Sequence, residues 1–169
     1  MDKYIWQEFL AHYSTKLVEN ASELWNPVPA EAIESKWMGF PPATDEEILL
    51  AEKRLNLDLP PSLRTFYQVT NGWRDTGFFI HNILPTHEIN WLKLRDPQLY
   101  QIAAEAEKAA SPFKDDPDNK RLYKYQNDQG TWVKRSLILT SEGDASWWLL
   151  DPQRLNQSNE WAGGLWASW

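Results

Sequence analysis

Residues 39–73, GFPPATDEEILLAEKRLNLDLPPSLRTFYQVTNGW, are the most patterned part of this 169-residue chain. Thr44 followed by Glu47 is a capping box, in which the threonine oxygen accepts from one free amide and the glutamate reaches back to another. Pro60-Pro61 ends the first apolar run and is tolerated in the first turn of a second helix. Asn71-Gly72 can take the left-handed conformation that a helix stop needs. The stretch therefore predicts two short helices held at a fixed angle.

The segments on either side of this stretch predict a mixture of helices and strands. Apolar residues at helical spacing predict a helix from about Lys3 to Val18, another over 31–37 and a third over 96–111. Runs of strand-forming residues predict strands over 77–85, 136–140 and 146–151, and residues 141–144 are typical of a hairpin turn between the last two.

Two further segments carry mixed signals. Trp132-Val133 is expected to begin or extend another strand. The tail spaces Trp161, Leu165 and Trp169 as a helix would, but Gly163-Gly164 weakens that interpretation. No repeat or low-complexity linker is found, so we expect one domain over residues 1–169. Its expected parts are a helical region (1–72, with the helix pair at 44–72), a strand-rich region (77–151) with a helical and loop insert (91–121), and a Trp-rich end (152–169).

Composition limits the kinds of site and partner. The sequence has no cysteine, which excludes disulfides, thiolate metal sites and a cysteine nucleophile. The start has no basic segment followed by an apolar one, and no window is apolar enough for a membrane span, so we expect a cytoplasmic protein. Lys and Arg total 17 against 24 Asp and Glu, a net charge of −7. This charge disfavours nucleic acid and attracts a basic partner, unless it only keeps the protein soluble.

Motifs for catalysis or metal binding are weak in this sequence. His81 and His87 flank a predicted strand, but Pro85 intervenes and no carboxylate has ligand spacing, so ordinary histidines are expected. Residues 115–119, DDPDN, lack the central glycine and the distant glutamate of a calcium loop. No nucleophile elbow, phosphate-binding loop or Ser-His-Asp arrangement can be assembled. We therefore expect no catalytic residue, no cofactor and no metal, with a pair of converging carboxylates as the hydrolytic alternative.

Tryptophan is unusually frequent, with 11 in the chain, and it serves cores, sugar platforms and protein-binding hot spots alike. Trp147 and Trp148 are adjacent on a predicted strand, so they are expected to face opposite ways. Trp73 follows the Asn-Gly stop in an expected loop, beside Arg74 and Asp75. In that position it is either an interface anchor or a lid packed on the core.

The helix pair, residues 43–73, resembles the signature of the SUKH superfamily, which includes the yeast cell-wall-synthesis regulator domain and many bacterial immunity proteins. The signature combines an acidic helix start, an Ile, a Glu near a Leu, Leu-Pro, an aromatic-bearing helix and Asn-Gly. The matching residues are Glu46, Glu47, Ile48, Glu52, Leu55, Leu59, Pro60, Phe66, Tyr67, Asn71 and Gly72. The apolar members Ile48, Leu55, Leu59, Phe66 and Tyr67 are core candidates, and Glu52 is expected to hold a backbone amide near the Asn-Gly stop. The insert from about Trp91 to Arg121 and the Trp-rich end depart from the signature.

The resemblance implies an α+β domain with helices packed on one side of a curved, mainly antiparallel sheet, and a binding function without catalysis. It also implies a protein partner, because many members are similar to immunity proteins that neutralise a toxin, often a nuclease. The acidic balance suits such a basic partner. The expected binding surface is Trp73, Arg74 and Asp75 together with the acidic loop residues Asp115, Asp116 and Asp118. The alternatives are a regulatory interaction module without a toxin and, third, a carbohydrate-binding or hydrolytic protein.

Overall fold

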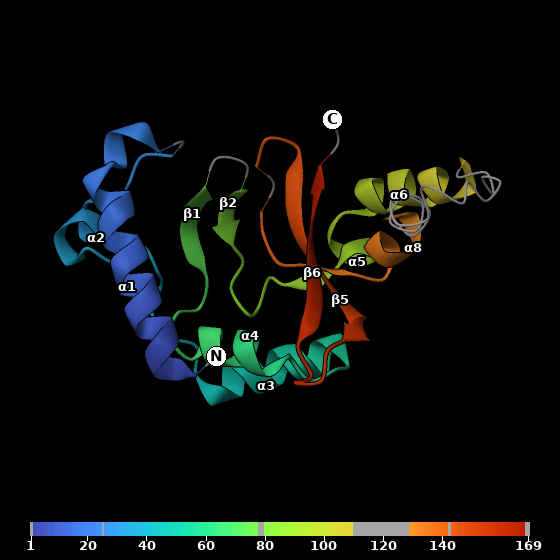
Figure 1. The fold of residues 1–169 in the computed structure, drawn as a ribbon, viewed down its shortest axis with the longest axis horizontal. Helices are drawn as coiled ribbons and strands as arrows, with labels where there is room; N and C mark the ends of the chain where they lie inside the picture. Colours follow the sequence, from blue (N-terminus) through green and yellow to red (C-terminus); the bar gives the residue numbers. More distant parts are fainter. Residues whose placement is uncertain (1, 25, 78–79, 110–128, 142, 168–169) are drawn as a thin grey trace, which may run out of the picture.

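A computed structural model describes residues 2–24, 26–77, 80–109, 129–141 and 143–167 of the chain. The helices are α1 (Lys3–Glu19), α2 (Ala30–Ser35), α3 (Asp45–Leu55), α4 (Pro61–Tyr67), α5 (Leu92–Arg95), α6 (Pro97–Ala109) and α8 (Gln129–Lys134), with a 3-10 turn η1 (Ala21–Glu23). The strands are β1 (Trp73–Gly77), β2 (Ile80–Ile83), β3 (Asn90–Trp91), β4 (Leu137–Ile138), β5 (Ser146–Leu155) and β6 (Trp161–Ala167). In Figure 1, α1 and α2 stand to one side of the strands, α3 and α4 run below them, and α5, α6 and α8 lie on the other side. The predicted α+β class is confirmed.

The helix pair forms for the reasons that its sequence indicates. The Thr44 hydroxyl accepts from the Glu47 amide at 3.2 Å, and the Glu47 carboxylate accepts from the Thr44 amide at 2.7 Å, so the capping box is complete. Asn56 ends α3 in the left-handed conformation, with φ of 55°. Pro61 then occupies the first turn of α4. The two predicted helices are confirmed.

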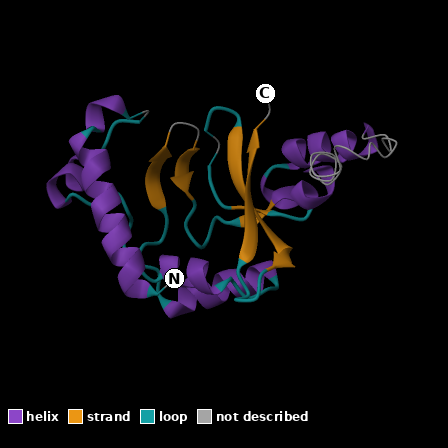
Figure 2. Ribbon diagram, viewed as in Figure 1, coloured by secondary structure: helices purple, strands orange, loops and turns teal. Residues whose placement is uncertain are grey.

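The strands form one curved antiparallel arrangement, drawn as orange arrows in Figure 2. β1 pairs with β2, and β3, β4, β5 and β6 form a second ladder in that order. The two ladders are joined where the Leu84 amide donates to the Leu139 carbonyl and the Ser141 amide donates to the Asn82 carbonyl, both at 2.9 Å. β1 and β6 therefore lie at the two ends of the arrangement.

The family signature packs the helix pair against the strands. The five core candidates are all buried: Ile48, Leu55, Leu59, Phe66 and Tyr67. The Tyr67 hydroxyl donates to the Leu84 carbonyl at 2.9 Å, and Arg54 donates to the carbonyls of Thr86 and Ile89, each at 2.8 Å. The Asn71 side chain accepts from the Thr86 amide at 2.7 Å. The signature therefore fixes the chain between β2 and β3 onto the helix pair.

Two predictions of secondary structure are wrong. Trp132-Val133 lies in α8 rather than in a strand, because Val133 is fully buried against the core and this packing overrides its strand propensity. The tail from Trp161 is strand β6, hydrogen-bonded along β5, so its helical spacing does not report a helix. The hairpin turn predicted at residues 141–144, of which residue 142 lies outside the described part, is supported by the Gly143–Ser146 bridge and the positive φ angles of Asp144 and Ala145.

Candidate functional site

A groove with a volume of about 470 Å³ opens between α1, α4 and the strands. Its lining is almost entirely apolar and rich in aromatic rings, and we call it the aromatic groove. Its residues are Trp6, Phe9, Leu10, Tyr13, Pro60, Ser62, Leu63, Phe66, Trp73, Thr76, Ile83, Leu139, Trp148, Leu150, Glu160 and Trp161. The α1 residues face the β5 and β6 residues across this groove.

The α1 wall is held in place by its own polar atoms. The Trp6 indole N–H donates to the Ser62 carbonyl at 3.0 Å, and the Tyr13 hydroxyl donates to the Thr76 carbonyl at 3.0 Å. These bonds tie α1 to α4 and to β1, and they satisfy the two polar groups that the rings carry. Phe9 lies one turn from each of them and stacks on Tyr13 with ring centres 6.1 Å apart. Its side chain remains 55% exposed, so it offers apolar surface to a ligand.

The opposite wall comes from one face of the β5–β6 hairpin. Trp148 and Leu150 are two residues apart on β5 and therefore share a face. Trp148 is paired with Leu165 of β6, and both side chains are partly exposed, at 38% and 49%. Glu160, at the start of this hairpin's second strand, accepts from the amide and hydroxyl of Ser62 at 3.0 and 2.6 Å. This wall is thereby fixed to the beginning of α4.

The lining of the groove suits apolar groups. Its titratable groups are Tyr13 and Glu160, and both are already engaged with Thr76 and Ser62. Burial, and then the nearby charge of Asp75, raise the pKa of Tyr13, so its hydroxyl stays protonated. Across the described residues, no cluster of His, Asp or Glu side chains is arranged to hold a metal ion. The described helices also include none with the length and apolarity of a membrane span.

Trp73 is not an exposed anchor on a loop, so that interpretation is wrong. It lies in β1 with 1% of its surface exposed, stacked on Tyr13 and edge-on to Trp37 with ring centres 6.3 and 5.2 Å away. The alternative, a tryptophan packed on the core, is confirmed. It contributes to the floor of the aromatic groove.

Arg74 and Asp75 are also committed to the fold. The Arg74 guanidinium lies 3.9 Å from the centre of the Phe40 ring and donates to the Gly39 carbonyl at 2.7 Å. Asp75 is 4% exposed, and this burial raises its pKa against the opposing effects of the Asn26 amide and His81. Asp75 is therefore buried, whereas Arg74 is half-buried with 22% of its side chain exposed, and their expected role in partner binding stays a prediction. Asp115, Asp116 and Asp118 lie outside the described residues.

Glu52 holds a backbone amide, but not the one expected. Its carboxylate accepts from the Leu59 amide at 3.0 Å, in the connection between α3 and α4, instead of near Asn71-Gly72. Asn71 bonds to Thr86, and Gly72 has a φ of 105° where a side chain would meet the Ile83 carbonyl. These residues stabilise the fold. They hold α4 in place, and α4 lends Ser62, Leu63 and Phe66 to the lining of the groove.

The sequence contained part of the signal for the groove. The adjacent residues Trp147 and Trp148 do face opposite ways: Trp148 lines the groove, and Trp147 packs against the core. The alternation of side chains along a strand could not tell which of the two tryptophans was exposed. Phe9 belongs to the periodic apolar face of α1, and only the positions of α4 and β5 show that part of this face is open.

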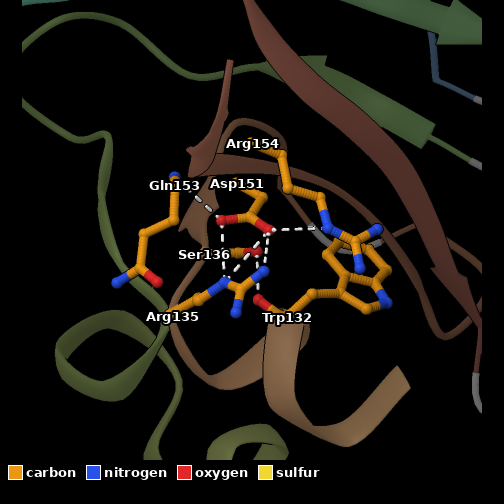
Figure 3. A network of polar contacts seen from close by, with 6 residues as sticks. All are labelled: Trp132, Arg135, Ser136, Asp151, Gln153 and Arg154. Carbon is orange, nitrogen blue, oxygen red and sulfur yellow. Dashed lines mark hydrogen bonds and ion pairs between the residues drawn. The ribbon is translucent and has the colours of Figure 1, made fainter. Parts of the chain in front are cut away.

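The other face of the hairpin is held by a buried ion pair, shown in Figure 3. Asp151 of β5 is 1% exposed and accepts from Arg135 at 3.0 Å (Nε) and 2.7 Å (Nη2), and from the Gln153 amide at 3.0 Å. Arg154 approaches the same carboxylate at 3.6 Å. These partners satisfy the buried charge, and the cluster links the end of α8 to β5.

Comparison with known proteins gives one match. The model of the SMI1 / KNR4 family (SUKH-1) matches residues 42–166, which include α3, α4, β1 to β5 and all but the last residue of β6. α1 precedes the matched segment. No curated protein and no solved structure gives a significant match. The family match covers well over half of the chain, and its segment supplies the signature pair and the groove residues from Pro60 to Trp161, so the chain belongs to the SMI1 / KNR4 family (SUKH-1).

Proposed function

We propose that this chain is a non-catalytic, immunity-type protein that neutralises a toxin domain by binding it through the aromatic groove. The observation that carries the proposal is the pair of open aromatic side chains, Phe9 and Trp148, on opposite walls of a fixed apolar groove. Membership of the SUKH-1 family supports a protein-binding role. Exposed aromatic rings around an apolar depression are typical of the hot spots of protein interfaces.

The energetics of the groove suit an inserted apolar side chain. Its walls are positioned by hydrogen bonds within the chain, so binding orders little new structure and retains most of the gain from excluding water. The net charge of −7 raises the encounter rate with a basic toxin, and this contribution weakens as salt is added.

The α1 wall gives the groove its selectivity in this proposal. Phe9 lies on α1, before the segment that matches the family, whereas Trp148 lies within that segment. If related chains share the family domain but differ in α1, each chain would present a different wall to its partner and could accept a different toxin. Specificity is a difference between affinities, and a single changed wall is enough to produce it.

The test is co-expression of the full chain with the toxin domain encoded beside its gene, followed by a binding titration. We expect growth to be rescued, and we expect Phe9→Ala and Trp148→Ala each to weaken binding by about tenfold or more. Leu94→Ala on α5 is the matched control, because Leu94 is 65% exposed but does not line the groove. Binding that both groove variants leave unchanged, or a neighbouring toxin that the chain does not bind, would contradict the proposal. Groove-dependent binding to a protein that is not a toxin would point instead to a regulatory module.

A further inference from the structure

The outer edge of β6 is an open strand edge at the end of the sheet. β6 pairs with β5 from Trp161 to Ala167, and no described segment pairs with its other side. The opposite end of the sheet differs, because β1 is covered by a bridge from Trp73 to Gly39 and by the Arg74 amide donating to the Met38 carbonyl. Only one of the two end strands is therefore protected by the described part of the chain.

Hydrogen bonds on β5 show which groups of β6 point outward. The Trp148 carbonyl accepts from the Leu139 amide and the Trp148 amide donates to Thr140, so both polar groups of Trp148 point toward β4. In an antiparallel ladder these directions alternate, so Leu149 and its partner Gly164 point toward each other. The N–H and C=O groups of Gly163 and Leu165 consequently point away from β5, toward the open edge.

Nothing in the composition of β6 protects this edge. Edge strands are usually guarded by lysine, proline, inward charges or bulges, because an unguarded edge recruits another strand. Residues 161–167, WAGGLWA, contain no charged residue and no proline, although the chain as a whole carries a net charge of −7. The one irregularity in the β5–β6 pairing lies on β5, between Asp151 and Leu155 at the turn end of the hairpin, and it leaves the pairing of Gly163, Gly164 and Leu165 regular.

We propose that β6 pairs with β6 of a second copy of this chain, forming an antiparallel dimer with a two-fold axis at Gly164. The outward groups permit this register, because Gly163 then pairs with Leu165 of the other copy and their free N–H and C=O groups meet. Residue sizes favour it as well: Gly163 lies opposite Leu165, Ala162 opposite Trp166, and Trp161 opposite Ala167. Each large side chain covers a small residue, an arrangement that stabilises glycine-containing strands.

The dimer would continue the sheet across two copies. Residues paired across antiparallel strands share a face, and Gly163 and Leu165 are on the face of β6 that also carries the groove residues of β5. The two aromatic grooves would therefore open on the same side of one extended sheet. This assembly does not rest on the proposed toxin binding, since it uses only the edge of β6.

The test is sedimentation velocity of the full chain over a range of concentrations, with hydrogen exchange on the same samples. We expect a monomer–dimer equilibrium, with the amides of Gly163 and Leu165 becoming more protected as the dimer forms. Gly163→Lys and Leu165→Glu should each shift the midpoint of the monomer–dimer equilibrium to about tenfold higher protein concentration, because each change occurs twice in a symmetric interface. An added side chain at Gly163 fits, since its Cβ would lie 3.5 Å from Leu150.

Mixing the two variants tests the register. In the mixed dimer the lysine introduced into one chain would face the glutamate introduced into the other, so the equimolar mixture should dimerise at concentrations at which each variant alone is mostly monomeric. Leu94→Lys, a charge placed on exposed α5, is the control and should dimerise like the wild type. Circular dichroism and thermal unfolding check that each variant is folded. A wild-type chain that stays monomeric at high concentration, a dimer that survives both variants, or amides protected only when a different protein binds would each overturn the proposal.

Discussion

Glu52 and Arg64 join α3 to α4 through a nearly buried carboxylate. Nη1 of Arg64 lies 2.6 Å from both carboxylate oxygens of Glu52, and the same carboxylate accepts from the Leu59 amide at 3.0 Å. The Glu52 side chain is 7% exposed, whereas Arg64 reaches solvent at 35%. One carboxylate therefore closes the connection between the helices and pairs them.

We predict that Glu52→Ala lowers the free energy of unfolding by about 2 kcal/mol, because it leaves a buried amide without an acceptor and Arg64 without its partner. The exposure of Arg64 keeps the loss below that of a fully buried pair. Urea unfolding followed by circular dichroism measures it. Lys16→Ala is the control, since the Lys16–Glu19 pair is exposed and its loss should change stability by less than about 0.5 kcal/mol. Equal unfolding midpoints for the two variants would contradict the prediction.

The two adjacent glycines of β6 should differ sharply in their tolerance of alanine. A Cβ at Gly164 would lie 2.7 Å from the Trp132 ring, whereas one at Gly163 would make an ordinary 3.5 Å contact with Leu150. We predict that Gly164→Ala costs about 1–3 kcal/mol by pushing α8 away from the hairpin, and that Gly163→Ala changes stability by less than about 0.5 kcal/mol. Thermal unfolding of both variants is the measurement. Similar losses in the two would show that Trp132 does not restrict this strand.

Asp75 should make stability fall as the pH rises through the acid range. Burial raises its pKa in the folded protein, so the folded state holds the Asp75 proton more tightly than the unfolded chain does. This contribution is full below the ordinary carboxyl pKa and is lost as the pH rises through the raised value. Asp75→Asn removes it, and asparagine tolerates the φ of 51° at this position.

We therefore predict that the wild type loses stability relative to Asp75→Asn as the pH rises from the ordinary aspartate pKa of about 3.9 through the raised pKa of Asp75. Urea unfolding at each pH gives the difference between the two proteins. Asp45→Asn, at an exposed helix start, is the control for a carboxylate that is not buried. A difference between wild type and Asp75→Asn that stays constant with pH would refute the assignment.

Local signals in the sequence predicted the helix pair, but only tertiary packing defines the groove. Thr44 and Glu47 complete a cap within one helical turn, so the sequence contains everything that the start of α3 needs. Trp73 was misplaced because its charged neighbours suggested exposure, whereas its burial depends on Tyr13, far earlier in the chain, and on Trp37. The strand β6 was missed because the spacing of Trp161 and Leu165 fits a helix, and only pairing with β5 decides against it. Predictions failed where a contact outside the segment itself decided its structure.

Substitutions at Trp147 and Trp148 should have different effects, one on folding stability and the other on partner binding. Trp148 lines the aromatic groove and is 38% exposed, whereas Trp147 lies on the opposite face of β5 and packs against the core. We predict that Trp147→Ala costs about 2–3 kcal/mol of folding stability but leaves the affinity of the folded protein for its partner unchanged. Trp148→Ala should cost about 1 kcal/mol or less of stability while weakening binding by about tenfold or more.

Urea unfolding measures the stability of both variants, and calorimetric titration well below their unfolding midpoints measures partner affinity. The comparison is matched, because the two variants remove the same side chain from neighbouring positions on one strand. If Trp147→Ala weakened binding and Trp148→Ala did not, the binding surface would lie on the α8 side of the hairpin. The proposed role of the aromatic groove would then be wrong, while the fold that positions it would be unaffected.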